Sequence, residues 1–237
     1  MSGRPLAIQA VGLGKRFGRH WALAHVDLDV SAGASLLVAG ANGSGKTTFL
    51  RLVAGLHRPT RGSLGVFGHD TVTDRLECRR SLTLISHAAC LYDGLTPRET
   101  LRTWARLGNG GRDGAGGQSE DMLEELLSEA ELADRGDAFV AGFSAGMRKR
   151  LSLLRLRLEK PRLLLLDEPF SALDVEGRRL VEGWIRGFRE QGGTVVIASH
   201  DLERTAPLCD SALVLERGQM AWAGSAEEVA ARREGTV

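Results

Sequence analysis

The segment Gly40-Ala41-Asn42-Gly43-Ser44-Gly45-Lys46-Thr47 decides the fold of this chain. It fits the pattern G-x-x-x-x-G-K-[ST], in which glycines let a loop curl so tightly that backbone N–H groups surround phosphate oxygens. Lys46 is one of only four lysines and can reach β- and γ-phosphates, and Thr47 offers a hydroxyl to Mg²⁺. The pattern predicts that Gly40 to Thr48 bind a nucleotide with Mg²⁺.

The sequence on either side of this loop predicts the required strand and helix. Ser35 to Ala39 is a short continuous apolar run, typical of a strand buried on both faces. Apolar residues between Thr47 and Gly55 recur at helical spacing, and the start of that helix directs its positive dipole end to the same phosphates. The context favours nucleotide binding over a chance glycine turn. A phosphate loop alone does not separate kinases, GTPases, motors and transporters.

Composition limits the class of protein. The 237 residues are 43% hydrophobic and 26% charged, which is ordinary for a globular chain. Thirty-one basic and 30 acidic residues give a net charge of +1, so we expect no nucleic-acid partner. Three cysteines without a CxxC pair favour a reducing compartment. No apolar run reaches the length of a membrane helix and the first residues lack a secretory signal, so we expect a cytoplasmic chain.

Strands alternate with helices at both ends of the chain, and the middle is helical. We expect further strands at 6–10, 26–30, 63–68, 82–86, 163–167, 194–199, 212–217 and 220–223, and helices at 97–107, 119–132, 144–158 and 176–190. Residues 69–80 read as a polar connector, and the glycine-rich residues 108–117 as a flexible loop. The pattern predicts an α/β fold, with a single domain 1–237 whose core lobe spans about 1–87 and 161–237 and whose helical subdomain spans about 88–160.

Two carboxylates follow the apolar run Leu163 to Leu166. Ligands bind at the carboxyl ends of parallel strands, so we expect Asp167 and Glu168 beside the phosphates. Adjacent residues on a strand point to opposite sides, which gives the two acids different tasks. We expect Asp167 to hold Mg²⁺ and Glu168 to orient or deprotonate the attacking water. The alternative is a strand end capped by solvated charges.

His200 ends another apolar strand, which begins at Val195, and is expected at the same edge of the sheet. A lone histidine is more often structural. Beside the phosphates, however, His200 can donate a hydrogen bond to the γ-phosphate, so we treat it as a second candidate catalytic residue.

The segment Phe143 to Arg150 predicts a second anion site. Ser144 and Gly146 stand at a helix start, where a hydroxyl, open N–H groups and the helix dipole act together. Two phosphate sites in one chain, one of them without a lysine beside the anion, suggest that two chains share two nucleotides. The alternative is an N-capped amphipathic helix.

Taken together, these motifs resemble those of the nucleotide-binding subunit of ABC transporters, in the same order and over almost the whole chain. The matching segments are the phosphate loop, FSAGM at 143–147, LLLLDEP at 163–169, SALD at 171–174 and His200. The resemblance implies a P-loop NTPase of the ABC type, with a mixed sheet core, an N-terminal antiparallel β region and an all-helical insertion. It also implies ATP and Mg²⁺ as ligands. ATP would lie between Gly40 to Thr48 of one chain and a second chain's Ser144, Ala145, Gly146 and Met147, with Asp174 in the D-loop.

Other residues are assigned by the same resemblance. Phe17 matches the aromatic residue that stacks on adenine, with a core phenylalanine as the alternative. His87 stands where the family usually has glutamine, and in its neutral form it can bind Mg²⁺ or water. Ala145 and Met147 replace glycine and glutamine of the family signature, and Met147 cannot donate the amide hydrogen bonds of glutamine.

Within the family, the tracts at 85–107 and 143–174 look most like the haem-exporter ATPases of cytochrome c biogenesis. Such a subunit would form a homodimer on the inner face of the cell membrane and power export through a separate integral membrane subunit. Drug, lipid and polysaccharide exporters are alternatives, as are soluble ABC ATPases of DNA repair, translation or iron-sulfur assembly. A P-loop kinase is disfavoured by FSAGM and the D-loop.

Overall fold

The computed structural model describes residues 5–86, 90–108 and 119–229. The chain divides into two compact units. The first comprises residues 1–84, 162–168 and 185–237, and the second comprises residues 85–161 and 169–184.

The parallel half of the sheet forms the centre of the first unit. Strand β3 (Ser35–Ala39) lies between β8 (Thr194–Ser199) and β9 (Ser211–Glu216), and β7 (Leu163–Asp167) pairs with β8, all in parallel. Every residue of β3, β7 and β8 is buried. Burial on both faces explains why these strands read as continuous apolar runs instead of alternating ones.

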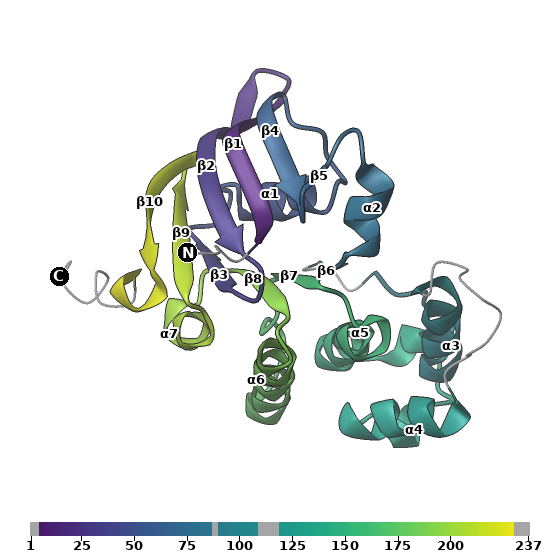
Figure 1. Ribbon diagram of the computed structural model, residues 1–237. Helices are drawn as coiled ribbons and strands as arrows, with labels where there is room; N and C mark the ends of the chain where they lie inside the picture. Colours follow the sequence, from purple (N-terminus) through teal and green to yellow (C-terminus); the bar gives the residue numbers. More distant parts are fainter. Residues whose placement is uncertain (1–4, 87–89, 109–118, 230–237) are drawn as a thin grey trace. The chain divides into compact units, whose positions relative to one another are not determined.

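The N-terminal half of the sheet is antiparallel. Strand β1 (Leu6–Phe17) pairs with β2 (His20–Ser31) and with β4 (Arg61–Val66), which pairs in turn with the short β5 (His69–Asp70). Figure 1 shows β1, β2 and β4 side by side. The expected strands 6–10 and 26–30 are parts of 12-residue strands. The sequence predicts only a part of each strand, because register shifts near Gly12 interrupt the apolar alternation.

Two further strands complete a mixed sheet in the order β5-β4-β1-β2-β10-β9-β3-β8-β7-β6. Strand β10 (Gln219–Ser225) runs antiparallel to β9 and parallel to β2, which joins the two halves. The last strand is β6 (Leu82–Ile85). Helix α1 (Lys46–Val53) packs Phe49, Leu50 and Val53 into the core beneath this sheet. The mixed sheet and the antiparallel N-terminal region therefore agree with the expected fold class.

The expected connector at 69–80 contains structure that the sequence did not predict. The carboxylate of Asp70 accepts hydrogen bonds from the backbone N–H groups of Val72 and Thr73 at 2.8 and 3.0 Å, and helix α2 (Arg75–Arg80) follows. The helix is only six residues long and mostly polar, so it carries no apolar periodicity. The short helix α7 (Leu202–Thr205) follows β8 in the same unit.

The second unit is helical. It contains α3 (Pro97–Gly108), α4 (Glu120–Glu129), α5 (Ala145–Glu159) and the first part of α6 (Val175–Glu190). Leucines of α3, α4 and α5 form its core. Figure 1 shows these three helices beside one another. The side chains of Thr96 and Glu99 bond each other's backbone N–H groups in a capping box that starts α3. No helix within the described ranges has the length and apolar character needed to cross a membrane.

Candidate functional site

The loop between β3 and α1 has a backbone that only glycine fits at two positions. Gly40 has φ of 144°, and a Cβ built there would lie 2.3 Å from the carbonyl oxygen of Leu215. Gly45 has φ of 111°, and its Cβ would lie 2.5 Å from the carbonyl oxygen of Ala22. Both contacts are with backbone atoms of neighbouring strands, so a side chain is excluded at each of these two positions. The tight curl predicted from the glycines agrees with this geometry, and phosphate binding by the loop stays a prediction.

Two polar side chains of the loop are buried. Lys46 is 7% exposed, and its ammonium group donates to the carbonyl oxygens of Gly40 and Ala41 at 2.7 and 3.1 Å. Ser44 is 5% exposed, and its hydroxyl oxygen has no hydrogen-bond partner among the residues that the structure describes. A buried ammonium group folded over the loop, next to an unsatisfied hydroxyl, is the arrangement that an oxyanion would complete.

Thr47 and Asp167 meet at the edge of the parallel sheet. The Thr47 hydroxyl donates to the Asp167 carboxylate at 2.9 Å, and Asp167 is 4% exposed. These residues lie 120 positions apart and are joined because β3 and β7 both end here. Mg²⁺ is commonly held by one or two protein oxygens together with water and substrate phosphates, so this oxygen pair fits Mg²⁺.

Glu168 contacts different partners from Asp167. Its Oε1 atom lies 2.8 Å from Nδ1 of His200 and accepts the backbone N–H of His200 at 3.1 Å. Its Oε2 atom accepts the Ser199 hydroxyl at 3.3 Å. Glu168 has a left-handed φ of 48°, a conformation that costs a non-glycine residue on the order of 1–3 kcal/mol and recurs at functional sites. The side chain is thus held in one orientation, with the imidazole, which is largely exposed, beside it.

Phe17, the predicted base-stacking residue, ends β1. Its side chain is 44% exposed, which is unlike a core phenylalanine. The ring packs edge-on against His57, with ring centres 5.3 Å apart and planes at 75°. The Lys15 ammonium group lies over the ring, 5.0 Å from its centre.

The other predicted site residues belong to the second unit. Ser144 caps α5, and its hydroxyl accepts the Met147 N–H at 3.2 Å, while Ser144 and Ala145 are exposed. A Cβ on Gly146 would lie 3.0 Å from the carbonyl oxygen of Ala172, so this glycine lets residues 171–174 approach the start of α5 closely. Asp174 caps α6 by accepting the Gly177 N–H at 2.8 Å.

The structure therefore gathers one set of predicted residues in the first unit. Lys46, Thr47, Asp167, Glu168 and His200 all lie at or just after the carboxyl ends of β3, β7 and β8. His87 lies outside the described residues.

Sequence reasoning missed three residues that contact predicted site residues. Ser199 bonds Glu168, while Lys15 and His57 contact Phe17. Ser199 had a signal, because it directly precedes His200 at the end of a strand. Lys15 and His57 had none, because their contacts depend on tertiary packing.

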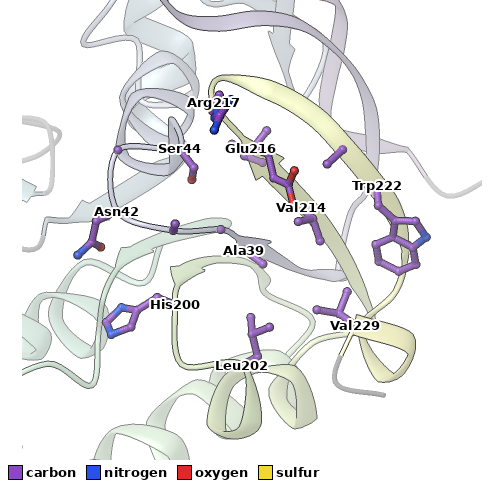
Figure 2. Close-up of a pocket in the computed structure, with 15 residues that line it drawn as sticks. Ala39, Asn42, Ser44, His200, Leu202, Val214, Glu216, Arg217, Trp222 and Val229 are labelled. Atoms are coloured by element: carbon purple, nitrogen blue, oxygen red, sulfur yellow. The ribbon is translucent and has the colours of Figure 1, made fainter. Parts of the chain in front are cut away.

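A cavity of about 1000 Å³ opens against the first half of the loop. Figure 2 shows Asn42, Ser44 and His200 beside it, with Trp222 and Val229 at the far side. Its lining includes Gly40 to Ser44 and residues of β9 and β10, and it does not include Thr47 or Asp167. The cavity adjoins the phosphate loop but is not centred on the carboxylate pair.

A glycine-rich loop between a buried parallel strand and a helix, with carboxylates at the end of another parallel strand of the same sheet, defines a P-loop nucleotide-binding protein. Comparison with known proteins gives the family. The model of the ABC transporter family matches residues 23–171, which is more than half of the chain, and the chain belongs to this family.

Curated relatives agree with the family. The chain is 35% identical over 229 residues to a daunorubicin resistance ATP-binding protein of Streptomyces coeruleorubidus, covering 97% of this chain and 71% of that protein. It is 32% identical over 225 residues to a sulfate/thiosulfate import ATP-binding protein of Mesorhizobium japonicum, covering 94% of this chain. The chain spans 65% of the length of that import protein. These names do not support the expected likeness to haem exporters.

Solved structures agree with the fold. A structure described as the ATP-binding subunit of an ABC transporter superimposes with a TM-score of 0.83 at 25% identity, covering 96% of this chain and 93% of that one. An ATP-binding cassette described as dimeric, in a post-hydrolysis state with ADP and Pi, gives a TM-score of 0.81 at 23% identity over 92% of this chain and 98% of that one. The second likeness bears on the fold alone.

Proposed function

We propose that this chain binds ATP with Mg²⁺ and hydrolyses it as the ATPase subunit of an ABC transporter. The observation that carries the proposal is the convergence of Lys46, Thr47, Asp167 and Glu168 at one edge of the parallel sheet, with Asp167 bonded to Thr47 and Glu168 bonded to His200. A cation, two oxygen ligands and a separately held carboxylate are the groups that hydrolysis of a phosphoanhydride needs.

The loop would bind the triphosphate through its backbone N–H groups, with Lys46 exchanging its carbonyl contacts for phosphate oxygens. Thr47 and Asp167 would hold Mg²⁺, which when bound neutralises charge on the phosphate oxygens. Glu168 would accept a proton from a water molecule as the water oxygen bonds to the γ-phosphorus. The bond between that phosphorus and the bridging oxygen breaks, and the oxygen leaves with ADP.

His200 and Ser199 would orient the carboxylate of Glu168, the proposed catalytic base. Both contact the Glu168 carboxylate from the end of β8, so they would fix its rotamer, and the exposed imidazole would also reach a phosphate oxygen.

Phe17 would stack on the adenine of ATP, for which its exposed ring is suited.

A second copy of the chain would complete the site. Ser144, Gly146 and the exposed start of α5 would form the anion site of the second unit. A γ-phosphate that touches both the loop of one chain and this helix start of another would close a dimer, and hydrolysis would remove the shared contacts. Asp174 and the variant residues Ala145 and Met147 would lie at that interface.

The membrane partner and the cargo follow from the proposed ATPase role. The relatives are named for sulfate/thiosulfate import and for daunorubicin resistance, which supports coupling to a membrane subunit without selecting a cargo or a direction. We place the chain in the cytoplasm on the inner face of the membrane, bound to such a subunit. Export, and haem export in particular, rests on the sequence resemblance alone.

The test uses Glu168→Gln, which keeps the side-chain shape and removes the base. We expect this variant to bind ATP and accumulate as a dimer, measured by light scattering with and without ATP. Ser144→Arg in the same background should prevent the dimer, because it places a bulky side chain at the helix start. A Glu168→Gln chain that stays monomeric with saturating ATP would count against the shared-nucleotide dimer.

A further inference from the structure

The ring of Phe17 is held from two directions by side chains that no motif predicted. The Lys15 ammonium group lies over the ring at 5.0 Å from its centre, which occupies one face with a cation. The His57 imidazole meets the ring at 75°, an edge-to-face geometry that fixes its tilt. With 44% of the side chain exposed, the ring keeps open surface for another planar group.

Hydrogen bonds join the end of β1 to the segment that follows His57. Lys15 Nζ donates to the carbonyl oxygen of Arg58 at 2.9 Å, and the Arg16 N–H donates to the Thr60 hydroxyl at 3.0 Å. The Thr60 N–H donates to the Gly14 carbonyl oxygen at 2.8 Å. The segment that carries His57 is therefore fastened along the end of β1, directly beside Phe17.

The same segment is the exit from α1. The His57 N–H donates to the Arg51 carbonyl oxygen at 3.2 Å, so the imidazole is positioned by the last turn of the helix that begins at Lys46. Helix α1 has eight residues and, at 1.5 Å per residue, is about 12 Å long. Helix α1 thus connects the phosphate loop to the segment that holds His57 against the ring of Phe17.

We propose that Lys15 and His57 are positioning residues for nucleotide binding, which orient Phe17 so that one defined face of its ring receives the base. The proposal rests on the proposed function, because it concerns the base end of the same ATP. Neither residue touches the phosphates, and neither takes part in hydrolysis. Burial, followed by the charges of Lys15 and Arg51, lowers the pKa of His57, so the imidazole is neutral at pH 7 and compatible with the adjacent ammonium group.

The experiment separates base binding from phosphate binding. Dissociation constants are measured by calorimetry for ATP and for inorganic tripolyphosphate, which has no base, in the wild type and in His57→Ala, His57→Phe and Lys15→Met. Arg58→Ala is the matched control, because the hydrogen bond from Lys15 goes to the backbone carbonyl of Arg58, which the substitution keeps.

We expect His57→Ala to weaken ATP binding about three- to tenfold, the value of one aromatic pair, and to leave tripolyphosphate binding unchanged. Lys15→Met should weaken ATP binding about two- to fivefold. His57→Phe should restore wild-type ATP affinity, because it keeps the edge-to-face ring. Arg58→Ala should match the wild type for both ligands.

Tripolyphosphate binding also shows that each variant is folded. Equal losses for ATP and tripolyphosphate in His57→Ala, no loss of ATP affinity, or failure of His57→Phe to rescue would each overturn the positioning role. A wild type that binds neither ligand would overturn the proposed function, and this inference with it. A wild type that binds both equally would overturn the inference by showing that the base adds nothing.

Discussion

Replacement of Gly45 by alanine tests the account of the phosphate loop. At φ of 111° an alanine is strained by on the order of 1–3 kcal/mol. Its methyl group would also lie 2.5 Å from the Ala22 carbonyl oxygen and 2.8 Å from a Leu23 methyl carbon, and overpacking of this kind costs a further 1–3 kcal/mol or so. Gly45→Ala should therefore destabilise the first unit by about 2–6 kcal/mol.

Two matched variants divide this cost into its parts. Gly43 has φ of 79° with nothing within 4 Å of a built Cβ, so Gly43→Ala should show the backbone strain alone, about 1–3 kcal/mol. Gly187 lies inside α6 with open space around it, so Gly187→Ala should stabilise the protein by about 0.5–1 kcal/mol.

Thermal unfolding by circular dichroism measures the series. At roughly 2–4 °C per kcal/mol for a chain of this size, Gly45→Ala should melt lower than Gly43→Ala, and both should melt lower than Gly187→Ala. Gly45→Ala should also lose tripolyphosphate binding. If Gly45→Ala and Gly43→Ala melted at the same temperature, the close approach of β2 to the loop would be wrong.

Three further predictions follow from other parts of the structure. Thr47→Val, which keeps the shape and removes the hydroxyl, should abolish the increase in ATP affinity that Mg²⁺ produces, measured by calorimetry with and without the metal. Native thiol labelling at pH 8 should modify the exposed Cys90 and leave the half-buried Cys209 intact in a mass spectrum, because desolvation raises the pKa of the Cys209 thiol to about 12; fast labelling of Cys209 would refute this raised pKa. Burial raises the pKa of Asp210, but hydrogen bonds from Ser35 and the charge of Arg189 outweigh this effect and leave the pKa below 3.8. The contribution of Asp210 to the free energy of unfolding is therefore present above pH 3.8 and is lost as the pH falls through the folded-state pKa. In urea titrations, Asp210→Asn should accordingly lose less unfolding free energy below pH 4 than the wild type. An equal loss in both proteins would contradict the interactions of Asp210 with Ser35 and Arg189.

The buried strands were the most predictable part of the fold. Ser35–Ala39, Leu163–Asp167 and Thr194–Ser199 were predicted with their observed bounds, because strands buried on both faces are short apolar runs with polar ends. Strand β1 was predicted at less than half its length. Its register shifts past Gly12 break the two-residue period on which such predictions depend.

The site was predictable where it follows strand ends and unpredictable where it depends on packing. The positions of Asp167, Glu168 and His200 followed from the rule that ligands lie at the carboxyl ends of parallel strands. The bond between Glu168 and His200 did not, since it depends on side-chain rotamers. The contact of His57 with Phe17 joins residues 40 positions apart through a turn with no motif. The sequence also did not predict that residues 169–184 belong to the helical unit, because α6 continues without a break into the first unit.

The most direct test of the central claim is release of inorganic phosphate from ATP by the purified chain, with Mg²⁺ and without any acceptor molecule. We predict steady release by the wild type and a rate about 10²- to 10⁴-fold lower for Glu168→Gln, with ATP affinity retained. Wild-type release that continued undiminished in Glu168→Gln would contradict the assignment of Glu168 as the base held by His200.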